Sequence, residues 1–152
     1  MSRPRFLSLI LAATTGLWLG GLTFYAAVVV PIGSHVVGRM DQGLITQQVT
    51  NWLNVIAMIA IVFLGVNTCR ERKPSTVITW LLLAALQVLL LLLHPVLDRQ
   101  LALVSEDRYS GPAFYQWHRA YLIVTTIMWF VALCHVGLVI GTARHKTDEN
   151  VT

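Results

Sequence analysis

The chain has 152 residues, of which 56% are hydrophobic and 12% charged, with a formal net charge of +4. The hydrophobic share is higher, and the charged share much lower, than in soluble globular domains, which excludes an ordinary soluble domain. We therefore expect an all-α integral membrane protein whose partner is the lipid bilayer.

The basic residues indicate how this protein is oriented. We predict four spans, approximately 6–30, 49–68, 77–97 and 113–142, in one membrane domain covering residues 1–152. With both termini cytoplasmic, the segments on that side carry seven basic and three acidic residues, whereas the opposite, outer loops carry four of each. Because basic residues favour the cytoplasmic side, the sequence predicts cytoplasmic termini, in a bacterial inner membrane. The net charge then reflects topology and indicates no nucleic-acid partner.

The first predicted span follows two arginines, as the core of a signal peptide would, but its apolar run continues to Pro31. Signal cores hold roughly 7–15 apolar residues, so we expect a retained anchor. Gly16 and Gly20 form a small-xxx-small pair of the kind that packs helices in lipid. We expect this pair to pack inside the bundle. The alternative is that Gly16 and Gly20 bind a partner helix, as in dimerisation.

The second span has the shortest apolar run and includes Asn51 and Asn54, which we expect at a wet or protein-facing end. A short charged turn follows, with Pro74 where the next helix would start, so the second and third spans are predicted to form an antiparallel pair. Cys69 and Cys134 both fall toward the cytoplasmic side of this topology, and we expect no disulfide.

The third span carries three polar residues on one helical face, because Gln87, His94 and Asp98 are spaced by seven and four residues. Polar side chains in hydrocarbon need a partner or water, so this face is predicted to point into the bundle. Asp98 could orient the His94 ring, as carboxylates do for metal-bound imidazoles. The alternative is that His94 only caps the span at the headgroup level.

Two further histidines fall at the same outer membrane face: His118 opens the fourth span, and His35 follows the first. The three imidazoles could converge on one site, with Asp98 as orienter or fourth ligand. Such a set could ligate copper or zinc, and two of the three could instead hold haem b axially. Aromatic residues at the start of the fourth span could flank a porphyrin, although an aromatic belt explains them equally well. His135 lies 17 residues after His118, and we expect it to bond a neighbouring helix instead.

Three segments, LWLGGLTFYAAVVVP, LLHPVLDRQ and FYQWHRAYLIVTT, resemble the transmembrane-protein-205-like family of four-helix integral membrane proteins. The resemblance covers most of the chain and rests on Pro31, on His94 and on His118 in their local contexts. The chain departs from the family pattern after His118, where residues such as Arg119 replace small and amide-bearing ones. The resemblance implies four spans and a link to metal or metallodrug handling, and it assigns no catalytic residue.

Two functional hypotheses follow. The first is a membrane protein that binds haem or a transition metal, for redox chemistry or metal handling, with His94 and His118 as leading ligands and His35 as the third. The second is a non-catalytic membrane scaffold or transport subunit without a cofactor. Proton or ion translocation ranks third, because the polar groups between Gln87 and His135 are too few and too separated. The sequence has no nucleophile beside a base, no phosphate loop and no Cys-rich motif, so we do not expect enzyme activity without a cofactor.

Overall fold

In the computed structural model of the protein, the residues described are 3–107 and 112–149, and every element in these ranges is helical. In chain order the elements are α1 (Arg3–Phe24), the π-helical segment η1 (Tyr25–Val29), α2 (Val30–Val36), α3 (Arg39–Glu71), α4 (Pro74–Asp107) and α5 (Pro112–Glu149). Four stretches are long and apolar enough to cross a membrane: Leu7–Val36, Asp41–Glu71, Pro74–Ala102 and Phe114–Gly141. The predicted all-α bundle of four membrane-spanning helices is confirmed, and the fold is that of an integral membrane protein.

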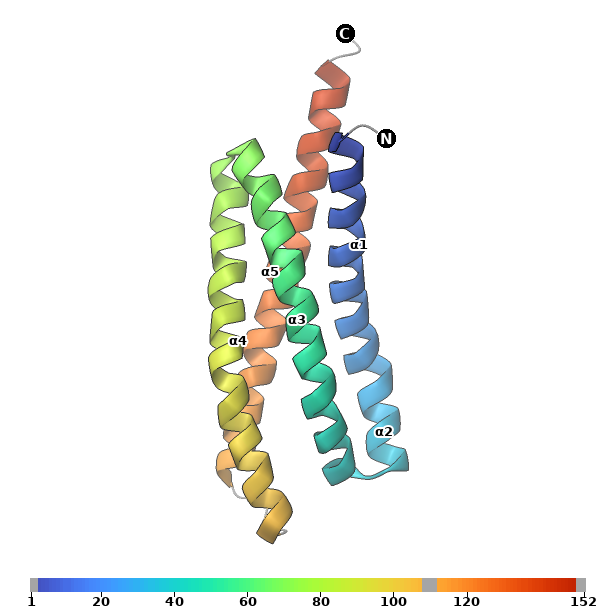
Figure 1. The fold of residues 1–152 in the computed structure, drawn as a ribbon, viewed down its shortest axis with the longest axis vertical. Coiled ribbons are helices and arrows are strands. Elements are labelled where there is room, and N and C mark those ends of the chain that lie inside the picture. Colours follow the sequence, from blue (N-terminus) through green and yellow to red (C-terminus); the bar gives the residue numbers. More distant parts are fainter. Residues whose placement is uncertain (1–2, 108–111, 150–152) are drawn as a thin grey trace.

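The helices run up and down side by side (Figure 1). The first helix begins, and the last helix ends, at the end of the bundle that also holds the α3–α4 turn. We call this the termini end. The α2–α3 connection lies at the opposite, distal end. Helix α3 packs against both α1 and α4, and α4 packs against α5. The predicted antiparallel pair is therefore confirmed as α3 and α4, while the cytoplasmic location of the termini stays a prediction.

Two tight connections reverse the chain. Between α2 and α3, Gly38 adopts φ 88°, a conformation that residues with a Cβ rarely take. Between α3 and α4, Arg72 adopts a left-handed conformation and its N–H bonds the Thr68 carbonyl, which ends α3. Pro74 then begins α4, where its missing N–H leaves no helical bond unmade.

The first span contains a widened turn just before Pro31. The Val30 N–H bonds the Tyr25 carbonyl, five residues back, which is the π-helical pattern of η1. A proline has no N–H and its ring displaces the carbonyl four residues earlier, here that of Ala27. The wider turn accommodates this clash, so the helix continues to Val36 and does not stop at Pro31.

The second helix starts earlier than predicted. The predicted span began at residue 49, whereas α3 begins at Arg39. The additional turns carry Gln42, which is buried and donates a hydrogen bond to the Tyr25 hydroxyl at 3.2 Å. Gln42 therefore ties this earlier part of α3 to the first span.

The buried core is mostly apolar and combines large and small side chains. It consists of Trp18, Ala57, Ala60, Ile61, Leu64, Leu83, Leu90, Tyr121, Met128 and Ala132. Helix association in lipid depends on close packing, and alanines on α3 and α5 allow the backbones to approach. One close approach involves Gly65, where a Cβ would meet the Trp80 ring at 2.7 Å. That ring is fixed because Trp80 Nε1 donates to the Ile61 carbonyl at 2.9 Å.

The glycine pair of the first span does not pack inside the bundle, so that expectation is wrong. Gly16 and Gly20 are exposed, and a Cβ at either would meet no described atom within 4 Å apart from its chain neighbours and the nearby backbone of its own helix. The inward face of this span is formed instead by Thr15, Trp18 and Tyr25. Gly16 follows Thr15 by one position, and Gly20 follows Trp18 by two. Residues at these spacings lie on different sides of a helix, so the glycines face away from the inward side chains.

Gly65→Ala is expected to lower the stability of the bundle by about 1–3 kcal/mol, because the new methyl group must displace the fixed Trp80 ring. Thermal unfolding in mild detergent, followed by tryptophan fluorescence, measures this change. The matched control is Gly16→Ala, which enters open space on another span. Equal melting temperatures for the two variants would contradict the proposed α3–α4 contact.

Candidate functional site

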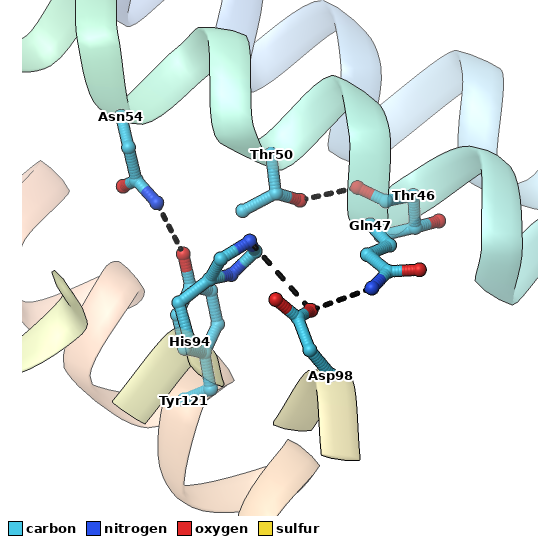
Figure 2. Close-up of polar contacts among 7 residues, drawn as sticks. All are labelled: Thr46, Gln47, Thr50, Asn54, His94, Asp98 and Tyr121. Atoms are coloured by element: carbon cyan, nitrogen blue, oxygen red, sulfur yellow. Dashed lines mark hydrogen bonds and ion pairs between the residues drawn. The ribbon is translucent and has the colours of Figure 1, made fainter. Parts of the chain in front are cut away.

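A group of polar residues lies between α3, α4 and α5 in the distal half of the bundle (Figure 2). On α4, His94 Nε2 lies 3.8 Å from Asp98 Oδ1, one helical turn away. On α3, the Gln47 amide donates to the same Asp98 oxygen at 2.8 Å. The side chain of His94 is 12% exposed and that of Asp98 is 34% exposed, so the pair runs from the bundle interior toward solvent or headgroups.

A second set of contacts continues this group toward the middle of the bundle. The Asn54 amide donates to the Tyr121 hydroxyl at 3.1 Å, joining α3 to α5. Gln87 on α4 donates to Asn54 Oδ1 at 3.4 Å. The Tyr121 and His94 rings lie 6.1 Å apart between centroids. The prediction that the Gln87, His94 and Asp98 face points into the bundle is therefore confirmed.

Two atoms of this polar group are buried and have no hydrogen-bond partner: His94 Nε2 and Gln87 Oε1. At 3.8 Å, the Asp98 oxygen is too far from His94 Nε2 for a hydrogen bond. Burying such a group without a partner costs about 1–3 kcal/mol. The near oxygen of Asp98 accepts a hydrogen bond from Gln47 and lies at ion-pair distance from His94. That Asp98 orients the ring stays a prediction.

The other two outer histidines have different surroundings. The His118 ring stacks on Phe114, with ring centroids 5.7 Å apart and planes 15° apart. His35, in the last turn of α2, is exposed. Within residues 3–107 and 112–149, no three His, Cys, Asp or Glu side chains are grouped closely enough to hold a metal ion. The structure thus joins His94 with Asp98 and does not bring His35 and His118 into one cluster with them.

His135 forms a separate contact, as expected. Its Nδ1 lies 2.7 Å from the Thr79 hydroxyl on α4, and its side chain is fully buried. The prediction that His135 bonds a neighbouring helix is confirmed. It takes no part in the Asp98 and His94 site.

Sequence reasoning missed most of the α3 contribution to this site. A polar residue occurs at every fourth position of α3, in the series Gln42, Thr46, Thr50 and Asn54. A spacing of four places these side chains along one face, so the signal was present in the sequence. At its distal end, this face bonds the first span, because the Tyr25 hydroxyl donates to Thr46 Oγ1 at 3.0 Å.

The bundle also has an apolar groove of about 500 Å³ between α1 and α5. It is lined by Leu19, Gly20, Thr23, Phe24, Ala27, Val28, Trp129 and Leu133. The Trp129 indole donates to the Thr23 hydroxyl at 3.0 Å across this groove. The lining includes no histidine, so the groove and the His94 site are distinct features.

Comparisons of this chain with protein-family models, curated proteins and solved structures found no match. The resemblance to the transmembrane-protein-205-like family accordingly stays a prediction, and the site is interpreted from its own chemistry.

Tyr121→Phe is expected to destabilise the protein by about 1–3 kcal/mol, because it removes the acceptor of a buried Asn54 amide. Tyr115→Phe is the matched control, since Tyr115 lies on the same helix and is 57% exposed. Denaturant unfolding in detergent micelles provides the comparison. If both substitutions had the same small effect, the Asn54–Tyr121 bond would contribute nothing to stability.

Proposed function

We propose that this integral membrane protein handles a transition-metal ion, which it binds between His94 and Asp98 in the distal half of the bundle. The observation that carries the proposal is the buried, unpartnered His94 Nε2, which faces a carboxylate oxygen 3.8 Å away. An imidazole nitrogen and a carboxylate oxygen are ordinary ligands of zinc and of other divalent transition metals.

The distance between the two atoms suits a shared ion. Zinc lies about 2.0–2.1 Å from a histidine nitrogen and about 2.0–2.2 Å from a carboxylate oxygen. The two bonds together span at most about 4.3 Å, so one ion can contact both atoms at 3.8 Å without a large movement of either side chain. The Gln47 amide would hold the carboxylate in place, as outer hydrogen bonds do in metal sites.

The number of protein ligands favours metal handling over a structural metal site. Structural zinc sites are usually closed by four protein ligands, whereas this pair offers two. Water or a ligand carried with the ion would complete the coordination. Asp98 is one-third exposed, which provides an entry for the ion from the distal end. Haem b held by His94 and His118 is a further prediction, and a Soret band in the visible spectrum of the purified protein would establish it.

Metal binding is tested by titrating zinc and cobalt into purified, chelator-treated protein, with calorimetry and elemental analysis as readouts. His94→Ala and Asp98→Asn are each expected to weaken binding at least tenfold, because each removes one of two protein ligands. His35→Ala is the control, and it is expected to bind normally. Loss of binding in His35→Ala would favour the three-histidine cluster instead, and unchanged binding in His94→Ala would refute the proposed pair.

A membrane scaffold or transport subunit without a cofactor is the second candidate. The observation that favours it is the outward-facing pair Gly16 and Gly20, which leaves a smooth, open surface on the first span. Small residues at this spacing let a second helix approach closely in lipid. The partner helix would belong to a second copy of the chain or to another membrane protein.

Gly16→Leu tests this candidate cleanly, because the larger side chain enters open space and should not disturb the fold. If the glycine face binds a second copy, the variant is expected to lose at least tenfold in self-association, measured by energy transfer between labelled chains in liposomes. Leu17→Val, at a 61% exposed neighbouring position, is the control. Monomeric wild-type protein would exclude self-association through this face.

A further inference from the structure

The apolar groove on the outside of the bundle lies between the first and last spans. Among the described helices, α3 packs against α1 and α4, and α4 packs against α5, whereas α1 and α5 face each other across this groove of about 500 Å³. Two of its lining residues, Gly20 and Trp129, lie near the midpoints of the spans Leu7–Val36 and Phe114–Gly141. The groove is therefore at the depth of the lipid hydrocarbon.

The walls of the groove offer no free polar group to a ligand. The hydroxyl in the lining belongs to Thr23, which donates to the Leu19 carbonyl at 2.7 Å and accepts from the Trp129 indole at 3.0 Å. The polar groups of these two side chains thus have their partners within the protein. A polar group brought into the groove would be left unpaired, at a cost of several kcal/mol, so the occupant must be apolar.

The size of the groove suits one hydrocarbon chain. A group the size of a water molecule or a methylene takes about 30 Å³, so the groove holds roughly 17 of them, close to the carbon count of one lipid acyl chain. On α1 the lining runs from Leu19 to Val28, about 13.5 Å of helix. A partner helix of this length, about 10 Å wide, would occupy on the order of 1,000 Å³, which is twice the volume of the groove.

An exposed face of α5 leads from the groove toward the distal end. Arg119 precedes Leu133 by 14 residues, close to four helical turns, so the two residues lie on one face about 21 Å apart. Leu122 and Thr126 lie between them on this face, both exposed, and the Thr126 hydroxyl donates to the Leu122 carbonyl at 2.8 Å. An extended acyl chain can therefore follow this face into the groove without meeting an unpaired polar group.

Arg119 supplies charge complementarity for a lipid headgroup. Its side chain is exposed, and it has no ion pair among the side chains that the structure describes. It lies five residues into the span that begins at Phe114, which places it near the headgroups of the distal leaflet. Arginine binds phosphate oxygens through paired, charge-assisted hydrogen bonds.

We propose that the α1–α5 groove binds one phospholipid of the distal leaflet. Arg119 binds the phosphate, and one acyl chain runs along α5 and ends in the groove between Phe24 and Leu133. This inference does not depend on metal binding at His94. Because the chain fills the space beside Gly20, it excludes a partner helix at that glycine.

Photolabelling of the wild-type protein in proteoliposomes tests the site. The probe is phosphatidylglycerol with a diazirine near the end of one acyl chain, present as a minor component of phosphatidylcholine vesicles, and mass spectrometry locates the adducts. We expect Trp129 and Leu133 to be labelled at least tenfold more than Phe130, which is 58% exposed and adjacent to Trp129 but lies on another side of the helix. Equal labelling would mean ordinary contact with bulk lipid and would overturn the proposal.

Two substitutions test the chain and the headgroup separately. Gly20→Leu places a side chain in the groove and is expected to lower the labelling at least fivefold, whereas Gly141→Leu also enters open space but outside the lining. Arg119→Gln is expected to lower it at least threefold, and Arg99→Gln, at another exposed arginine in the distal part of α4, is expected to leave it unchanged. Unchanged labelling in Gly20→Leu or in Arg119→Gln would overturn the proposal.

A second copy of the chain is the competing occupant of the groove. Thr23→Cys in a Cys69→Ser, Cys134→Ser background distinguishes the two, because a second copy seated there would bring the new thiols together. We expect oxidation in proteoliposomes to leave this variant monomeric. Rapid formation of a disulfide-linked dimer would overturn the lipid assignment.

Discussion

The structure depends on one constraint of the bilayer, which is that a polar group inside hydrocarbon must find its partner within the protein. This constraint decides which face of each helix turns inward. The stripe on α3 that contains Gln42, Thr46 and Asn54 turns toward its neighbours and bonds Tyr25 on the first span and Tyr121 on α5. Beside this stripe, Gln47 of the same helix bonds Asp98 on α4, so α3 makes side-chain hydrogen bonds to each of the other three spans.

The sequence was sufficient to predict the spans, their antiparallel pairing and the inward face of α4, because hydropathy and the 3.6-residue period depend on a single helix. It was not sufficient to predict which side chains of different helices meet. Length along a helix fixes the depth of His94 and His118, but the rotation of each helix is set by packing against its neighbours. His118 consequently stacks on Phe114 of its own helix, although it was expected to share a site with His94. The outward rotation of Gly16 and Gly20 has the same origin.

The polar residues of this bundle fall into two groups that do not connect. In the distal half, contacts run from Asp98 and His94 to Asn54 and Gln87. In the other half, they centre on His135. Between them, Leu83 and Met128 fill the interior almost without exposure. A polar path through the whole protein would require these side chains to separate.

These buried apolar side chains also limit the path that an ion bound at the proposed His94 site could take. To move further inward than Gln87, an ion held between His94 and Asp98 would have to pass the buried Leu83 and Met128, where desolvating a charge is very costly. It would therefore leave on the side of Asp98, whose side chain is one-third exposed. Such a site would exchange ions at the distal end of the bundle and would not pass them across the membrane. Gln47 would be central in this arrangement, because its hydrogen bond holds the carboxylate that would capture and release the ion.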